Sequence, residues 1–309
     1  MVYHSRVHQR QTGSDFNSNR VLVLGASGLL GSNVFNAFST KFETHGTYFR
    51  SENYCEENLY KVDASDFRAL KSRILELNPS RIINCLGLTS VEECESRPEA
   101  SWKLNSEIPI FISYLAKKIG AQLIHVSTDH LFSKVEVPRS ESEQVIPINQ
   151  YGFTKMAAEK TILKQNEYAL ILRTNFFGHS EKESKSILDF AINSMKTNTV
   201  INGFDDVLFT PVGVSEISNF LINPISLKAK GLLNFASSET ISKYEFMVMV
   251  SQVLKKYDAV INRTSISNSE LSVPRPNYMA LSATRLTNEF AYNLPTIQEM
   301  LENEIAGIV

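Results

Sequence analysis

The stretch "RVLVLGASGLLGS", residues 20–32, joins a short apolar run to a glycine-rich turn. The apolar run at its start has the length and composition of one buried strand. After the turn, Leu30, Val34 and Phe38 follow at four-residue intervals, which is the spacing of one face of a helix. The stretch therefore predicts a strand, a tight turn and a helix in direct succession.

Three glycines, Gly25, Gly28 and Gly31, occupy this turn. One glycine lets the chain reverse, one lets a pyrophosphate approach the N–H groups at the positive helix end, and one permits close packing of helix on strand. The spacing is G-x-x-G-x-x-G, whereas the standard fingerprint is G-x-G-x-x-G, and a glycine turn without a ligand is the alternative. Because the turn follows the first strand of a β-α-β series, the pattern favours dinucleotide binding.

The chain continues to alternate strand and helix patterns up to about residue 175. Further strands are expected at 45–49, 59–63, 81–87, 122–127 and 168–174. Helices are expected at 65–78, along an apolar stripe from Ala100 to Ile119, and at 151–165, with Ser65 as an N-cap and Gly120 as a C-cap. Repeated β-α-β units with buried strands predict a Rossmann-type, doubly wound parallel sheet in the α/β class, which binds ligands beyond the carboxyl ends of its strands.

The pattern becomes less regular after residue 175. Helices are expected near 186–197, 214–222 and 241–257, and short strands near 207–210 and 231–236. We therefore expect three parts, which are a flexible N-terminal tail at 1–19, an NAD(P)-binding Rossmann domain at 20–175 and a smaller substrate-binding α/β domain at 176–309. The last two are expected to be partly interleaved, because late chain can return to the main sheet.

The composition argues against nucleic-acid and membrane partners. The 309 residues have a net charge of -2 and no basic stripe. No apolar run approaches the ~18 residues of a spanning helix, and the polar N-terminus lacks the apolar core of a secretory signal. The 3 cysteines lie far apart and the 6 histidines are scattered, so neither disulfides nor a metal site is expected. A cytoplasmic location is expected.

The end of the second strand normally selects between NAD and NADP. An acid there bonds the ribose 2′-hydroxyl, whereas an arginine accommodates a 2′-phosphate. Here Arg50 comes first and Glu52 follows two residues later. The order favours NADPH, with NADH as the alternative if Arg50 is only a solvated surface residue.

Tyr151 and Lys155 lie four residues apart in an expected helix and so share one face. A phenol has an ordinary pKa of ~10, and a nearby ammonium lowers it toward the range useful for proton exchange. Ser127 and Thr128 leave the preceding strand, where they can cap a turn or hold a substrate oxygen. A lone Y-x-x-x-K is common and usually means nothing, but behind a glycine-rich turn and a strand-end hydroxyl pair it becomes a specific signal for a proton donor and the cation that tunes it.

With these residues the sequence resembles the extended short-chain dehydrogenase/reductases, and within them the dTDP-4-dehydrorhamnose reductase family. The resemblance extends over roughly residues 20–290 and depends on ordered motifs. They are "GASGLLG", "RIINCLGLTSVEECESRPEASWKLN", "STDHLF", "PINQYGFTKMAAEK", "LRTNFFG", "GLLNFASSETISKYEF" and "RPNYMAL".

The resemblance implies hydride transfer from NAD(P)H to the C4 ketone of a nucleotide-linked deoxysugar. It implies that Tyr151 protonates the nascent alkoxide, that Lys155 lowers the pKa of Tyr151 and holds the nicotinamide ribose, and that Thr128 bonds the carbonyl oxygen. The residues that it implies for cofactor binding are Gly25, Ser27, Gly28, Leu29, Leu30, Gly31, Arg50, Asp63, Cys85, Leu86, Gly87, Tyr151 and Lys155. Those that it implies for substrate binding are Val91, Asp129, His130, Phe176 and Arg275.

Several positions depart from the family pattern on the substrate side. His130 stands where the family usually has Tyr, Ser133 where it usually has Asp, Phe176 where many members have Trp, and Met279 where Ser is common. His130 is therefore either a new sugar contact or a packing residue. The departures leave the nucleotide and the sugar open.

Two further functions stay open beside an active reductase. One is a non-catalytic NADP-binding regulatory subunit with a protein partner, because relatives of this fold keep the nucleotide site in that role. The other is a nucleotide-sugar epimerase or, less favoured, a dehydratase on the same fold. An epimerase would hold its cofactor tightly through purification, whereas a reductase must release it in each turnover. The expected partner is a nucleotide-sugar substrate, as in dTDP-rhamnose and polysaccharide biosynthesis, and a homodimer is one of the open oligomeric states.

Overall fold

The computed structural model describes residues 19–49, 57–133, 137–179, 186–257, 259–306 and 308. Its main feature is a seven-stranded sheet in the order β11-β6-β5-β4-β1-β2-β3 with every neighbouring pair parallel. The strands are β1 (Arg20–Leu24), β2 (Glu43–Tyr48), β3 (Leu59–Lys61), β4 (Arg81–Asn84), β5 (Gln122–Val126), β6 (Leu170–Arg173) and β11 (Gly231–Asn234). The order reverses between β1 and β4, which is the switch point of a doubly wound sheet.

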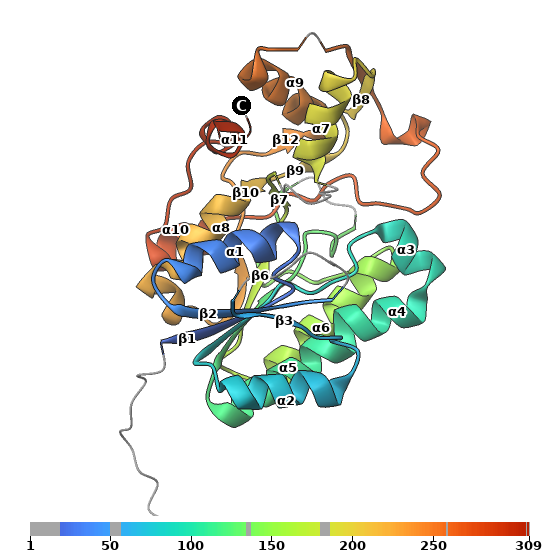
Figure 1. Ribbon diagram of the computed structural model, residues 1–309. Helices are drawn as coiled ribbons and strands as arrows, with labels where there is room; N and C mark the ends of the chain where they lie inside the picture. The colour runs from blue at the N-terminus through green and yellow to red at the C-terminus, as the bar shows by residue number, and fades with distance from the viewer. Residues whose placement is uncertain are drawn as a thin grey trace, which may run out of the picture.

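Helices cover both faces of this sheet (Figure 1). One layer contains α1 (Leu29–Ser39), α8 (Val214–Ile222) and α10 (Thr284–Phe290), and the other contains α2 (Phe67–Leu77), α5 (Ile108–Ile119) and α6 (Gln150–Gln165). Alternate side chains of β1 enter opposite cores, with Val21 and Val23 on the α1 side and Leu22 and Leu24 on the α2 side. A continuous apolar run is needed here because both faces of the strand are buried.

The predicted caps were right at one helix and wrong at another. Gly120 ends α5 in the left-handed region at φ 75, which a glycine adopts without steric cost. Helix α2 is capped by Asp66 and not by Ser65, because the Asp66 carboxylate accepts the N–H groups of Arg68 and Ala69 at 2.9 and 3.1 Å. The backbone N–H of Ser65 donates instead to the Asp63 carboxylate.

The expected long helix before Gly120 is built from several pieces. After α3 (Val91–Ser96) come α4 (Pro98–Trp102), a π-helical turn (Lys103–Glu107) and α5. Within the turn, the buried Asn105 side chain accepts the N–H of Leu88 at 2.8 Å and donates to its carbonyl at 3.0 Å. The local change of helix type therefore coincides with a side chain that fixes the loop after β4.

A smaller unit lies above the carboxyl edge of the main sheet (Figure 1). It contains α7 (Ile187–Lys196), α9 (Lys243–Leu254) and α11 (Ile297–Ala306), with 3-10 turns at Pro224–Leu227 and Ile266–Asn268 elsewhere after residue 175. Its short strands pair as β7 (Phe176–Phe177) with β10 (Val212–Gly213), β8 (Ile201–Phe204) with β13 (Ile261–Thr264), and β9 (Leu208–Phe209) with β12 (Ile241–Ser242).

The late part of the chain also contributes to the main sheet. Strand β11 extends the sheet beside β6, and α8 packs on α1. One apolar cluster runs from Val21 of β1 and Val34 of α1 to Phe246 and Met300 in the smaller unit. A domain boundary near residue 175 remains a proposal. Among the described residues, no helix is both long and apolar enough to cross a membrane.

Candidate active site

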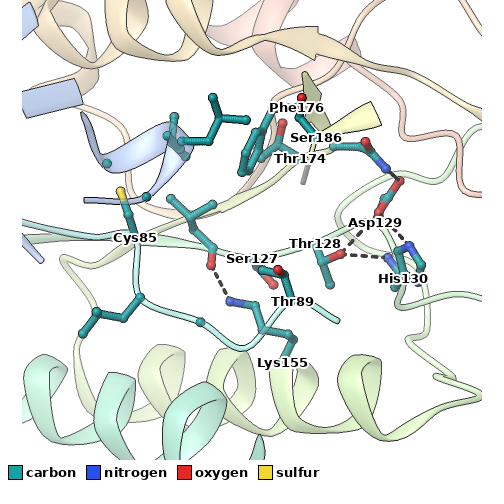
Figure 2. A pocket seen from close by; sticks show the side chains of 18 of the residues that line it. Cys85, Thr89, Ser127, Thr128, Asp129, His130, Lys155, Thr174, Phe176 and Ser186 are labelled. Atoms are coloured by element: carbon teal, nitrogen blue, oxygen red, sulfur yellow. Dashed lines mark hydrogen bonds and ion pairs between the residues drawn. The ribbon is translucent and has the colours of Figure 1, made fainter. Parts of the chain in front are cut away.

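A cavity of about 580 Å³ opens at the carboxyl ends of β1, β4, β5 and β6 (Figure 2). Its walls come from the glycine turn, from the loops after β4, β5 and β6, from α6 and from the start of α7. The lining residues are Ser27, Gly28, Leu29, Leu30, Gly31, Cys85, Leu86, Gly87, Thr89, Val126, Ser127, Thr128, Asp129, His130, Tyr151, Lys155, Thr174, Asn175, Phe176, Ser186 and Ile187.

The glycine turn has the shape needed for a phosphate at a helix start. Gly25 has φ +82, and a Cβ on Gly31 would lie 2.0 Å from the Gly25 carbonyl oxygen. Gly28 is the N-cap of α1, and among the described residues no side chain caps the N–H groups of the first turn. These N–H groups border the cavity at the positive end of the helix dipole, so the turn fits a dinucleotide pyrophosphate.

Two expected cofactor residues that the structure describes, Gly25 and Asp63, are not part of this cavity lining. Asp63 follows β3, and its carboxylate accepts the N–H of Ser65 at 2.8 Å. Arg50 lies outside the described residues, so the structure does not place it. Cys85 does line the cavity, and burial raises the pKa of its thiol to about 12, so the thiol is neutral at physiological pH.

The Tyr151 phenol lies one helical turn before Lys155 at the start of α6, which Asn149 caps through the Gly152 N–H. The Tyr151 side chain is buried. Burial raises the pKa of Tyr151, the hydrogen bond with Thr128 lowers it, and the negative charge of Asp129 raises it. The phenol therefore stays protonated at neutral pH and is available as a proton donor.

Lys155 extends from α6 beneath the cavity and donates a hydrogen bond of 2.6 Å to the Val126 carbonyl (Figure 2). Burial lowers the pKa of Lys155 to about 8, and the charge of Glu159 opposes that shift. Lys155 is not among the groups that shift the pKa of Tyr151. The lowering of the Tyr151 pKa by Lys155 therefore stays a prediction, and in this structure the ammonium is held at the end of β5.

Polar groups gather at the other side of the cavity (Figure 2). The Asp129 carboxylate accepts the Asn175 amide at 2.6 Å and the Thr128 hydroxyl at 3.3 Å. His130 Nε2 lies 3.9 Å from this carboxylate, while its buried Nδ1 has no hydrogen-bond partner within the described chain. Burial is the main cause that lowers the pKa of His130, so the imidazole is neutral at pH 7.

The remaining two substrate candidates lie just outside this lining. Val91 packs in a small cluster with Cys94, Tyr151 and Val273. Arg275 forms an ion pair with Glu92, and its buried Nε has no hydrogen-bond partner among the described atoms.

The family model described as RmlD substrate binding domain matches residues 19–308. The chain belongs to this family. The match covers nearly the whole sequence and confirms the resemblance to the dTDP-4-dehydrorhamnose reductases.

Curated relatives of this family member differ in what their names describe. The probable low-salt glycan biosynthesis reductase Agl14 of Haloferax volcanii is 24% identical over 90% of this chain and 95% of its own. The methionine adenosyltransferase 2 subunit beta of Mus musculus is 26% identical over 87% of this chain and 82% of its own. The dTDP-4-dehydrorhamnose reductase of Escherichia coli is 25% identical over 90% and 94%.

Solved structures confirm the fold of this family member. A dTDP-4-dehydrorhamnose reductase from Clostridium acetobutylicum has a TM-score of 0.82 at 22% identity, covering 94% of this chain and 99% of that one. The reductase from Bacillus anthracis, solved in complex with NADP, has a TM-score of 0.82 at 20% identity, covering 93% and 99%.

Several lining residues of this family member were not among the sequence predictions. They are Thr89, Val126, Thr174, Asn175, Ser186 and Ile187, together with Ser127, whose role was left open. Thr174 and Asn175 directly follow β6, so the strand-end rule that selected Thr128 could also have selected them. Ser186 and Ile187 come from the smaller unit, and no local pattern in the sequence places them at the main sheet.

Proposed function

We propose that this protein is an NAD(P)H-dependent oxidoreductase that reduces the C4 ketone of a nucleotide-linked deoxysugar. The observation that carries the proposal is the shared cavity of Thr128, Tyr151 and Lys155 next to the glycine turn. A reduction of this kind requires a positioned carbonyl, a hydride donor and one proton donor. The cavity offers a site for each of them.

The side chains would divide the work as follows. The bound NADPH supplies the hydride. The N–H groups after Gly28 hold its pyrophosphate, and Cys85, Leu86 and Gly87 border it on the β4 side. Tyr151, protonated at neutral pH because of its burial, gives its proton to the oxygen of the reduced ketone.

Thr128 and Lys155 would orient the reacting groups. The Thr128 hydroxyl lines the same cavity as Tyr151 and lowers the pKa of its phenol, and it would align the carbonyl oxygen. The Lys155 ammonium, already held by the Val126 carbonyl, can bond the hydroxyls of the nicotinamide ribose. Asp129, His130 and Phe176 would contact the sugar from the same side of the cavity.

The family relatives support a nucleotide sugar as the substrate class, and NADPH as the cofactor is supported by the neighbour solved with NADP. The nucleotide and the sugar stay open because the departures from the family pattern lie at substrate positions such as His130 and Phe176.

A second candidate function is a regulatory subunit that binds NADP without turning it over. It is favoured by the similarity to methionine adenosyltransferase 2 subunit beta, whose name describes a subunit of another enzyme. The polar set of Thr128, Tyr151 and Lys155 favours catalysis, since a cofactor held only for structural reasons needs no proton donor beside its nicotinamide.

Consumption of reduced nicotinamide separates the two functions. Purified protein would be mixed with NADPH or NADH and with dTDP-, UDP- and GDP-linked 4-keto-6-deoxy sugars, one at a time. Oxidation with one sugar, absent without it, supports the reductase. Tight NADPH binding without oxidation by any sugar of the panel contradicts it and favours the regulatory subunit.

A further inference from the structure

Glu159 is a buried carboxylate on α6 to which the proposed reaction assigns no role. Its relative exposure is 2%, and that of its partner Arg173 is also 2%. Arg173 Nη2 donates to Glu159 Oε2 at 2.7 Å, and Arg173 Nε lies 3.0 and 3.1 Å from the two carboxylate oxygens. The Ser127 hydroxyl donates to Glu159 Oε1 at 2.6 Å. The carboxylate therefore joins the ends of β5 and β6 to one helix.

The spacing along α6 connects Glu159 to the site. Tyr151, Lys155 and Glu159 follow one another at four-residue intervals and so share one helix face. Glu159 binds Ser127, and Lys155 binds the carbonyl of Val126, so both side chains hold adjacent residues of one strand end. Thr128, which hydrogen-bonds the Tyr151 phenol, is the next residue along this strand end.

Among the described groups that shift the pKa of Lys155, Glu159 is the one that carries a negative charge near pH 7. These groups are Glu159 on α6, Cys85 after β4 and Cys94 on α3, and Lys155 in turn acts on His125 of β5. Burial raises the pKa of both thiols and lowers that of His125 well below its ordinary value, so all three are neutral near pH 7. Arg173 on β6 is the neighbouring cation, and Glu159 pairs with it directly.

We propose that Glu159 is a positioning residue, whose carboxylate keeps Lys155 in its ammonium form and aligns the Ser127–Thr128 strand end for the reduction. The alignment part rests on the proposed function, whereas the effect on Lys155 does not. A buried ammonium without a nearby anion loses its proton readily, and a neutral amine is a weaker partner for ribose hydroxyls.

The direction of the pH effect follows from the charges. Burial lowers the pKa of Lys155 to about 8, and Glu159 raises it against that trend. Replacing the carboxylate by an amide removes the opposing charge, so the ammonium is lost at a lower pH. A neighbouring opposite charge shifts a pKa by about 1 to 3 units, and we expect a downward shift of about one unit.

The test follows the titration of Lys155 by NMR, in protein labelled with ¹³C at the Cε atoms of its lysines. The Lys155 signal is identified as the one that disappears in Lys155→Arg. The variants are Glu159→Gln and, as a matched control, Glu167→Gln, since Glu167 is exposed just after the same helix. The double variant Glu159→Gln with Arg173→Gln is included because the single change leaves a buried guanidinium unpaired and can unfold the chain.

We expect the Lys155 midpoint to lie near pH 8 in the unmodified protein and in Glu167→Gln. In Glu159→Gln it should lie about one unit lower. In the double variant it should also lie lower, but by less, because the positive charge of Arg173, which disfavours the ammonium, is removed as well. Equal midpoints in all folded variants would overturn the proposal. NADPH affinity should fall as the pH rises and Lys155 loses its proton, and in the Glu159 variants this fall should begin at a lower pH than in the unmodified protein. The same pH dependence in all variants would also count against the proposal. Failure of the sugar assay alone would contradict the reductase function and leave the effect on Lys155 standing.

Discussion

The His130 imidazole lies edge-on to the phenol ring of Tyr151, with 5.6 Å between the ring centroids and 76° between the ring planes. The contact places His130 beside the proposed proton donor and at the substrate side of the cavity. Its buried Nδ1 has no partner within the described chain, and an unpaired buried polar atom costs about 1–3 kcal/mol. A bond from this Nδ1 to the substrate would remove that cost, so we expect His130 to contact the sugar.

Replacing His130 by Phe separates a sugar contact from a packing role. We expect His130→Phe to leave the thermal midpoint unchanged or higher, because the ring is kept and the unpaired nitrogen is removed. The KM for the sugar should rise about tenfold, the scale of one lost hydrogen bond to a substrate. NADPH affinity should stay within twofold. An unchanged sugar KM would identify His130 as a packing residue.

Two glycines of the same turn should respond differently to a methyl group. A Cβ at Gly31 would lie 2.0 Å from the Gly25 carbonyl oxygen, whereas at Gly28 the nearest atom is 3.5 Å away. Gly31→Ala should therefore lower the free energy of unfolding by about 3 kcal/mol or more. Gly28→Ala should cost about 1 kcal/mol as a poorer N-cap but weaken NADPH binding at least tenfold. Denaturant unfolding and cofactor titration of both variants check this, and equal stability of the two would contradict it.

Much of the main sheet could be predicted because its signals are local. Apolar runs such as residues 20–24, followed by glycine and a four-residue apolar spacing, indicate a buried strand and its helix without tertiary information. The cap at Asp66 was missed because Ser65 and Asp66 are both good capping residues, and only the backbone decides which one has the helix N–H groups in reach.

The rest depends on contacts between distant segments. The return of β11 to the sheet beside β6 cannot be read from either strand alone, since the pairing joins Gly231 to Leu170. The same limit applies to the hydrogen bond of Lys155 to the Val126 carbonyl, which joins residues 29 positions apart. Ser186 reaches the cavity only because the smaller unit folds over the carboxyl edge of the sheet.

The cofactor preference depends on Arg50, which lies outside the described residues. If its guanidinium reads the 2′-phosphate, Arg50→Ala should weaken NADPH binding about tenfold or more and change NADH binding little. Arg68→Ala, which removes an exposed arginine on α2, is the control for net charge. Equal losses for NADPH and NADH in Arg50→Ala would show that Arg50 does not distinguish the two cofactors.

Lys243, the first residue of α9, should lower stability at neutral pH. Its ammonium lies 3.3 Å from the centre of the Phe209 ring and has no hydrogen-bond or ion-pair partner in the described part of the chain. Burial lowers the pKa of Lys243 from 10.5 to about 8, with the Asp129 charge opposing. The unfolded chain therefore holds this proton more tightly than the folded chain does. The charged Lys243 consequently lowers the free energy of unfolding below pH 8, and this loss fades as the pH rises toward 10.5.

Lys243→Met should consequently raise the thermal midpoint at pH 7, and the gain should shrink at pH 10. The exposed Lys228→Met is the matched control and should shift neither midpoint. A lower midpoint for Lys243→Met at pH 7 would mean that the ammonium stabilises the fold, against this prediction.

The central claim, that Tyr151 donates the proton of a ketone reduction, is tested most directly by single-turnover oxidation of bound NADPH. The sugar would be the member of the panel that the unmodified protein reduces fastest. We predict that Tyr151→Phe binds NADPH with nearly unchanged affinity and oxidises it slower by two or more orders of magnitude, the scale of a lost positioned acid. Tyr168→Phe, at a tyrosine that is 61% exposed, should react at the normal rate. Normal oxidation by Tyr151→Phe would contradict the assignment.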